Sequence, residues 1–325
     1  MSSSTTAVAN ARSKERANSF ITRLRSGDEA AYLITATCAL SIVAVTVLLV
    51  YELFLHSALS RHKFGLSFLF TSTWDPVAGQ YGALPFIYGT VVTSALALLI
   101  AVPLGVGAAI FLAEMAPPRI SDILTFLIEL LAAVPSVIFG LLAIFVMVPI
   151  LRVIEPGLRA TLGFLPIFKG PFYGVSLFSA GIILAVMIVP FVISISREVL
   201  LGVPNEQREA ALALGATKWE STWQIVVPFA RKGITGSIFL ALARALGETM
   251  AVTMVIGNDP KIRASLFAPG YSIAAVIANE FAEATGDLYV SALIELGLVL
   301  FALTIVINGI ARLLILTTTG KASAQ

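Results

Sequence analysis

The stretch PNEQREAALALGATKWESTWQIVVP, residues 204–228, decides the fold class because it is a polar segment in a chain that is otherwise strongly apolar. It lies between two long hydrophobic runs and carries the charged residues Glu206, Arg208, Glu209, Lys218 and Glu220. Such a segment is expected to be a folded cytoplasmic loop of a membrane protein, and not a linker.

The local sequence predicts two short helices in this loop. Asn205 follows a proline and is a good N-cap, and Gly215 is expected to end the first helix because only glycine adopts the required conformation without a Cβ penalty. Thr217 then caps a second helix, and Glu220, three residues later, completes a capping box. A helix, a glycine and a second helix of this kind indicate a docking element.

The faces of the two predicted helices are consistent with docking at a membrane surface. Trp219 and Trp223 are four residues apart and share one face, where indole rings suit a membrane interface. The first helix is expected to expose small side chains, which let the backbone of a partner approach closely. These side chains are Ala210, Ala211 and Ala213.

The same stretch resembles the EAA loop of ABC importer permeases, the segment that seats in a cleft of the ATPase subunit. The matching residues are Glu209, Ala210, Ala211, Gly215, Ile225 and Pro228. The sequence departs at Val227, where the family usually has leucine, and the change is conservative. The resemblance implies an ABC importer permease fold with a coupling loop. An ordinary amphipathic cytoplasmic loop is the alternative interpretation.

The composition indicates an all-α polytopic membrane protein. Hydrophobic residues make up 58% of the chain and charged residues 12%, and the mean hydropathy is +0.94, whereas soluble domains carry about 25% charge. Six runs are long enough to cross a bilayer, which takes ~20 residues in a helix. They lie near residues 31–55, 88–113, 123–150, 173–196, 234–257 and 289–315. Pro103, Pro135 and Pro190 fall inside these runs and predict kinks.

The runs divide the chain into a basic tail (1–30), a transmembrane permease domain (31–315) and a second tail (316–325). The first tail is expected to be disordered. With both ends inside, the inner segments hold 13 of the 21 Lys and Arg residues and the outer loops hold seven, which favours cytoplasmic termini and a cytoplasmic 204–228 loop. The outer loops 56–87 and 258–288 are rich in turn residues and aromatics, so they are either a docking surface for a periplasmic partner or structured connections.

Four ionisable residues lie within the predicted spans and too far from the span ends to snorkel easily: Glu129, Arg244, Glu248 and Glu295. A charge at mid-membrane costs roughly 2.5 to 3.5 kcal/mol, so each needs a partner, water or a function. Arg244 and Glu248 are spaced i and i+4 and are expected to share one helix face, where each partly neutralises the other. Glu129 and Glu295 are expected to be structural, and the alternatives are that either partners Arg244 in the pathway or faces water.

Two interpretations of Arg244 and Glu248 remain open. One is a buried ion pair that only fixes helix packing. The other is an anion site on a translocation route, because the planar fork of an arginine matches a tetrahedral oxyanion. A carboxylate beside that arginine accepts the hydroxyl of phosphate but repels sulfate, which has no hydroxyl at neutral pH.

The run ALARALGETMAVTMVIGN, residues 241–258, and the run ELLAAVPS, residues 129–136, resemble the permease subunits of bacterial phosphate-specific ABC transporters. The likeness covers roughly residues 30–315. It implies that Arg244 and Glu248 are tied to phosphate passage. It also implies a heterodimer with a second homologous permease, two cytoplasmic ATPase subunits, a periplasmic phosphate-binding protein and a place in the bacterial inner membrane.

Enzymatic chemistry is not indicated by the sequence. It contains no GxxxxGK[ST] loop and no cluster of residues with metal-ligand spacing, and its one cysteine, Cys38, lies in the first apolar run. ATP and Mg²⁺ are therefore expected on a partner ATPase, and this chain is expected to bind no cofactor. The alternatives are an ABC permease for another oxyanion or solute, a proton-coupled carrier that works alone, and a structural membrane subunit without a pathway.

Overall fold

The computed structural model describes residues 28–320. The chain divides into two compact units, Met1–Leu55 and His56–Gln325. The described part of the first unit is one apolar helix, α2 (Asp28–His56). The prediction of a disordered tail falls almost wholly on residues outside the described range. At the other end, the predicted tail 316–325 begins as helix, because α15 continues to Gly320.

In the second unit, the regular elements of the described residues are helical, with two isolated β-bridges. The first half of the unit contains α3 (Ala58–Phe64), α4 (Ser67–Phe70), α5 (Leu84–Ile110), η1 (Phe111–Met115), α6 (Pro118–Ala132), α7 (Ser136–Leu142), η2 (Ala143–Met147), α8 (Val148–Leu162) and η3 (Pro166–Phe168). The second half contains α9 (Leu177–Leu201), α10 (Asn205–Ala213), α11 (Lys218–Ser221), η4 (Thr222–Val226), α12 (Val227–Leu246), α13 (Met250–Val255), α14 (Ile273–Glu280) and α15 (Asp287–Gly320).

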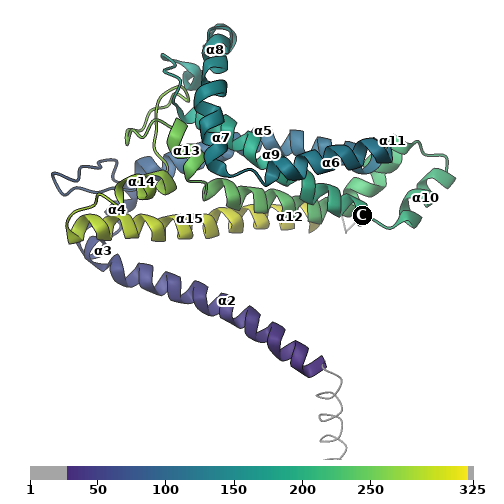
Figure 1. Cartoon of the computed structure of the whole chain (residues 1–325), viewed down its shortest axis with the longest axis horizontal. Coiled ribbons are helices and arrows are strands. Elements are labelled where there is room, and N and C mark those ends of the chain that lie inside the picture. Colours follow the sequence, from purple (N-terminus) through teal and green to yellow (C-terminus); the bar gives the residue numbers. More distant parts are fainter. Residues whose placement is uncertain (1–27, 321–325) are drawn as a thin grey trace, which may run out of the picture. The chain divides into compact units, whose positions relative to one another are not determined.

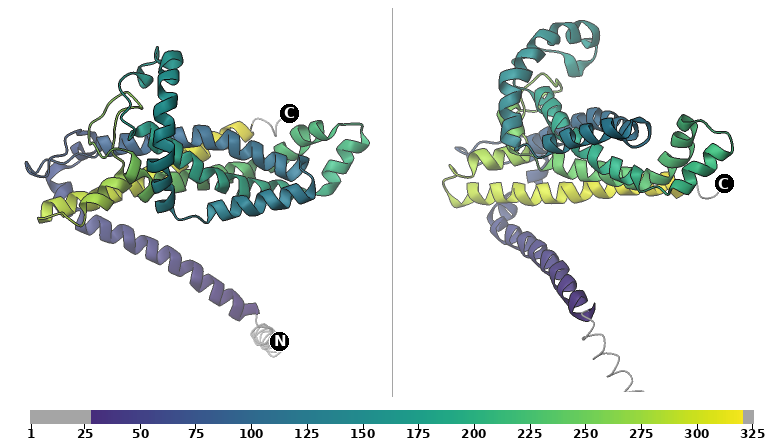
Figure 2. Two further views of the ribbon diagram at one scale, coloured as in Figure 1. Left: turned by 45° about the horizontal axis from the view of Figure 1, so that its top comes forward. Right: turned by 45° about the vertical axis from the view of Figure 1, so that its right-hand side comes forward.

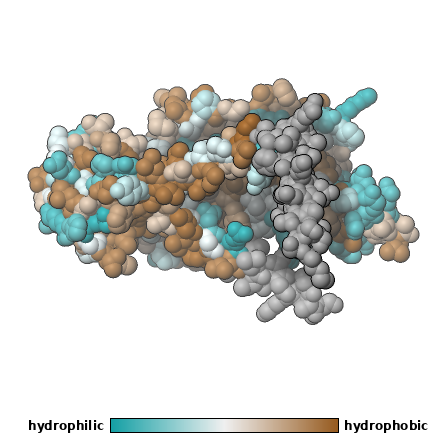
Figure 3. Space-filling view, turned by 90° about the horizontal axis from the view of Figure 1, so that it is seen from below, coloured by the Kyte–Doolittle hydropathy of each residue, from teal (hydrophilic) through white to brown (hydrophobic). Residues whose placement is uncertain are grey.

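Six helical segments of the described residues are long and apolar enough to cross a membrane, which confirms the expected number. They are Ala31–His56, Leu84–Met115, Ser136–Thr161, Leu177–Leu201, Lys218–Leu246 and Asp287–Leu313. Figure 3 shows apolar residues over much of the visible surface, with polar residues among them. A surface of this kind suits the hydrocarbon core of a bilayer.

Two of the expected spans are interrupted. Pro135 predicted a kink and not a break, and no interruption was expected at residues 247–249. The expected span at 123–150 is broken between α6 and α7, where Pro135 takes an extended conformation at the N-cap. Proline lacks a backbone N–H and disfavours helix at the preceding residue, so the chain changes direction there. The membrane-length segment consequently begins at Ser136 instead of at residue 123. The expected span at 234–257 is broken at residues 247–249, between α12 and α13.

The core is formed where the helices approach closely at glycines. A Cβ on Gly105 would meet the side chain of Val192, so α5 and α9 pack tightly there. A Cβ on Gly140 would meet the side chain of Met254 and the Cα atom of Ala251, which brings α7 against α13. Figures 1 and 2 show α5, α9 and α12 side by side, with the α10 and α11 segments together at one end of this unit. The second halves of both interrupted spans therefore pack against each other.

An aromatic cluster holds the opposite end of the unit together. Trp74 donates to Glu280 Oε2 at 2.9 Å, and the Tyr289 hydroxyl donates to the same oxygen at 2.7 Å. The Trp74 ring packs edge-on against Tyr81 and Phe86, each at 4.9 Å between ring centroids. Residues 56–87, which the sequence predicts to be the first outer loop, are therefore attached to α14 and α15 and form a structured connection. Whether it also receives a partner stays a prediction.

Candidate functional site

The 204–228 loop contains the two predicted short helices. Gly215 has φ +89°, a conformation that favours glycine, and it follows the end of α10 as expected. The capping box is also confirmed. The backbone N–H of Glu220 donates to Thr217 Oγ1 at 3.2 Å, and the backbone N–H and the hydroxyl of Thr217 donate to Glu220 Oε2 at 2.7 and 2.8 Å.

Two details of the predicted loop are wrong. The N-cap of α10 is Pro204, and Asn205 is already helical, with its Oδ1 accepting from Arg208 Nη1 at 3.2 Å. The expected exposure of Ala211 also fails, because this residue is 9% exposed. A helix that packs on the body of the protein must bury one face, and Ala211 lies on that face.

The remaining loop residues of the predicted site differ in accessibility. Glu209 and Ala210 are exposed on α10, and Leu214 at the tip is 90% exposed. Ile225 is half-buried and Pro228 is exposed at the start of α12. The Trp219 and Trp223 rings lie edge-on at 5.5 Å between centroids, so they share a face as predicted. The outer surface of α10 and its tip is thus open to a partner.

Sequence reasoning missed the residue that attaches this loop to the spans. Arg208 on α10 forms an ion pair with Glu114 on η1, with 2.8 Å between Nη2 and Oε1. The side chains are 18% and 8% exposed. The two residues are 94 positions apart, and local spacing could not connect them. The sequence offered one weak signal of this attachment, which is that Arg208 is a long basic side chain in a segment whose other charges are exposed.

Arg244 and Glu248 lie at the break in the fifth span. Arg244 is in the last turn of α12, before the break, and Glu248 is in the break itself. Arg244 is exposed in the last turn of α12, where its guanidinium carbon lies 5.6 Å from the centre of the Phe191 ring. Glu248 is half-buried, and its Oε1 accepts the backbone N–H of Ala251 at 3.2 Å, at the start of α13. The two charges do not share one continuous helix, and within residues 28–320 they form no ion pair. The expected i, i+4 neutralisation is therefore wrong.

The break explains why this arginine and carboxylate stay apart. Gly247 has φ −94° and ψ 0°, and the helix ends there with its N–H bonded to the Ala243 carbonyl at 3.3 Å. Non-helical backbone within a membrane protein is tolerated where it is buried in protein or lines a water-filled cavity. An exposed arginine next to such a break is available to a third, negatively charged group.

Glu129 and Glu295 have different surroundings. Glu129 is exposed on α6. Glu295 is 6% exposed on α15 and lies beside Ser60 and Arg61 of the α3 segment. In the described part of the chain, neither carboxylate pairs with Arg244. A structural role therefore suits Glu295.

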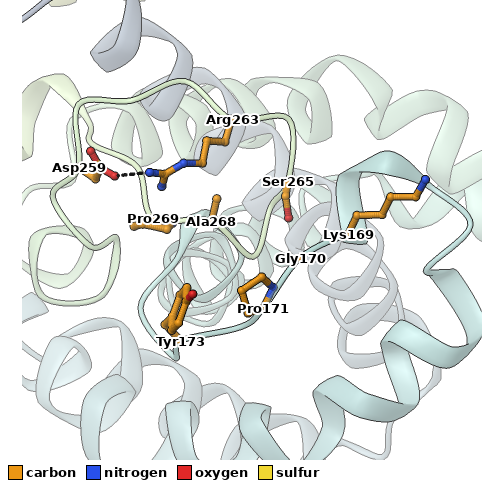
Figure 4. Close-up of a pocket in the computed structure, with 9 residues that line it drawn as sticks. All are labelled: Lys169, Gly170, Pro171, Tyr173, Asp259, Arg263, Ser265, Ala268 and Pro269. Carbon is orange, nitrogen blue, oxygen red and sulfur yellow. Dashed lines mark ion pairs between the residues drawn. The ribbon is translucent and has the colours of Figure 1, made fainter.

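A cavity of about 410 Å³ lies between the loops that follow η3 and α13. Its lining includes Lys169, Arg263 and Asp259. Figure 4 shows the charged ends of Lys169 and Arg263 pointing to opposite sides, and Arg263 forms an ion pair with Asp259 at 2.9 Å. The basic groups do not converge on one point, so the cavity has no assembled anion site.

The comparisons with known proteins agree with the helical architecture. Residues 101–316 match the family model described as "Binding-protein-dependent transport system inner membrane component". The phosphate transport system permease protein PstC of Mesorhizobium japonicum is 46% identical over 297 residues, covering 89% of this chain and 91% of the relative. The chain belongs to this family of phosphate transport system permeases.

Other members are similarly close. PstC of Haemophilus influenzae is 47% identical over 286 residues, covering 86% of this chain and 90% of its own length. PstC 2 of Mycobacterium tuberculosis is 40% identical over 293 residues, covering 87% of this chain and 90% of its own length. The permease is therefore a multi-pass inner membrane component of an ABC transporter and not its ATPase.

Proposed function

We propose that this permease forms half of the translocation pathway of an ATP-driven importer of inorganic phosphate. A second homologous permease would form the other half, two ATPase subunits would bind on the cytoplasmic side, and a phosphate-binding protein would deliver cargo from the periplasm. The observation that carries the proposal is the combination of PstC relatives over most of the chain with the exposed 204–228 loop at one end of the helices.

The exposed face of the 204–228 loop is the proposed docking surface for the ATPase. Glu209 and Ala210 are open on α10, and the nearly fully exposed Leu214 is an apolar side chain that a groove in a partner would cover. The distribution of Lys and Arg, 13 in the segments on this side against seven on the other, supports a cytoplasmic position for the loop and both termini.

Arg244 and Glu248 are the proposed contacts for phosphate. Arg244 supplies a planar donor pair, which suits a tetrahedral oxyanion. Because Glu248 is not neutralised by Arg244, its carboxylate remains a strong acceptor for a phosphate hydroxyl. Sulfate has no such hydroxyl at neutral pH, and its oxygens would face a charge of the same sign. The pair therefore favours phosphate by repelling the competing anion.

Transport by the assembled complex tests the cargo assignment. The permease would be purified with its ATPases and its partner permease, reconstituted in liposomes with the binding protein, and supplied with labelled phosphate or labelled sulfate. We expect phosphate uptake that requires ATP and much slower sulfate uptake. Equal uptake of the two anions would assign the permease to a broader oxyanion importer.

Two further experiments test whether the permease works alone and whether the loop binds the ATPase. The permease reconstituted alone is expected to transport nothing, and uptake without an ATPase would indicate a stand-alone carrier. A Glu209→Lys variant is expected to lose co-purifying ATPase, because it reverses a charge on the proposed docking face. Glu283→Lys is the matched control, since Glu283 is also exposed but follows α14, at the opposite end of the unit.

A further inference from the structure

Arg208 joins three segments that are distant in the sequence. Its Nη2 donates to Glu114 Oε1 at 2.8 Å and to the Leu200 carbonyl at 2.8 Å. Its Nη1 donates to the Val203 carbonyl. Its Nε donates to the two oxygens of Glu114 at 3.2 and 3.3 Å. One side chain of the loop therefore holds the end of α5 and the end of α9.

The position of each contact favours a mechanical link. Leu200 is in the last turn of α9 and Val203 directly follows that helix, where carbonyls have no partner within the helix. Glu114 lies in the π-helical turn that ends α5, and such turns are frequent at functional positions. The Arg208 guanidinium adds a donor to these carbonyls, of which that of Leu200 also accepts the Val203 N–H at 3.2 Å, and it binds the terminal turn of α5, so neither end can move freely from α10.

The contacts are shielded from water, unlike a typical surface ion pair. Leu112, Leu200, Val203 and Val226 are buried in the apolar cluster at this end of the protein. The neighbouring pair between Arg197 and Glu198 offers a comparison, because Glu198 is 71% exposed and adjacent in sequence to its partner. Exposed pairs of that kind contribute little. Removal of either Arg208 or Glu114 instead leaves a buried charge without its partner.

We propose that the Arg208–Glu114 pair is the rigid link through which movement of the coupling loop reaches α5 and α9. Arg208 is then a positioning residue, which does not touch phosphate or ATP. The inference rests on the proposed function of the loop as the ATPase docking element. The spans that it drives, α5 and α9, pack tightly at Gly105 and Gly181, so they would move as one body.

The test measures phosphate imported per ATP hydrolysed by the reconstituted complex. Arg208→Ala is expected to lower this ratio about tenfold, within the range typical of energetic coupling between sites. The ATPases should still co-purify and hydrolyse ATP, because Glu209, Ala210 and Leu214 are unchanged. Glu114→Gln is expected to lower the ratio in the same direction. The double variant should be no worse than the more impaired single variant, because both remove one interaction.

Two controls distinguish a link from a general loss of charge or stability. Glu198→Gln removes a nearby carboxylate that is exposed, and its ratio should stay within about twofold of the unmodified complex. Arg208→Lys keeps the charge but replaces the planar fork with a single ammonium, and it should give an intermediate ratio. If the Arg208→Ala complex fails to assemble, Arg208→Lys and Glu114→Gln decide the question.

The outcomes that overturn the link are distinct from those that overturn the function. Import by the unmodified complex with unchanged ratios in the assembled Arg208 and Glu114 variants would overturn the link alone. Additive losses in the double variant would also overturn it. A failure of the unmodified complex to import phosphate would overturn the proposed function.

Discussion

Arg208 in the 204–228 loop and Arg244 near the break in the fifth span carry the same guanidinium group in different surroundings. Arg208 is satisfied by Glu114 and by the carbonyls of Leu200 and Val203. Arg244 is exposed, and its guanidinium carbon lies over the face of the Phe191 ring. An arginine whose donors are all used within its own chain holds the structure together, whereas one whose donors remain open can bind something else.

The two carboxylates near these arginines show the same difference. Glu114 is 8% exposed and accepts several bonds from one arginine. Glu248 is half-buried and accepts one backbone N–H of α13 through Oε1. The Arg208–Glu114 pair thus satisfies its own charges. Arg244 and Glu248 keep donor and acceptor capacity, which we propose is used by phosphate. Four substitutions test this contrast.

The largest effect is expected for Arg244→Ala. Removal of the open guanidinium should reduce phosphate import roughly a hundredfold, as is typical when one charge of a desolvated contact is truncated. Import by the reconstituted complex is the measurement. Arg231→Ala, an exposed arginine near the start of the same helix, is the matched control and should import normally. Normal import by a folded Arg244→Ala complex would remove this arginine from the pathway.

Glu248→Gln should change selectivity more than folding. Glutamine keeps an oxygen that can accept the Ala251 N–H, so the start of α13 is preserved. The negative charge that repels sulfate is lost, and the preference for phosphate over sulfate should fall roughly tenfold, the scale of a hydrogen bond to a charged group. Competition of unlabelled sulfate against labelled phosphate measures this preference, and an unchanged preference would contradict the role of Glu248.

Gly215→Val tests whether the shape of the loop matters separately from its charges. A Cβ at Gly215 meets no atom within 4 Å, so the cost comes from the φ of +89° alone. An L-residue in this region costs about 1–2 kcal/mol. We expect faster amide hydrogen exchange over residues 205–221 and less phosphate imported per ATP. Gly215→Asn should do less harm, and Gly236→Ala, in open space within a helix, should be neutral. Equal effects at both glycines would show that the turn is not special.

Thr217→Ala is expected to have the smallest effect. It removes the side chain that accepts the Glu220 N–H, which typically costs about 1 kcal/mol. Hydrogen exchange at Glu220 should accelerate, and Thr217→Ser should restore protection. Because the capping box is exposed and local, import should change little. A loss of import as large as that of Arg208→Ala would place the link in the second helix of the loop instead.

The sequence by itself determined the features that depend on neighbouring residues. Apolar runs specify six membrane-length helices, because a helix satisfies its own backbone in lipid. Gly215 and the Thr217–Glu220 box specify the turn and the second helix of the loop, because capping acts over three or four residues. The motif around Glu209 identified the class of permease because its residues lie within one short stretch of the sequence.

Only the tertiary structure decided which charges meet. Pro135 and Gly247 were visible in the sequence, but whether a span bends or breaks there depends on the helices that pack against it, as α7 and α13 do at Gly140. The break separates Arg244 from Glu248, which regular spacing would have paired. The packing of α10 under the ends of α5 and α9 joins Arg208 to Glu114 and buries Ala211. Such contacts form between distant segments, so local sequence carries no direct record of them.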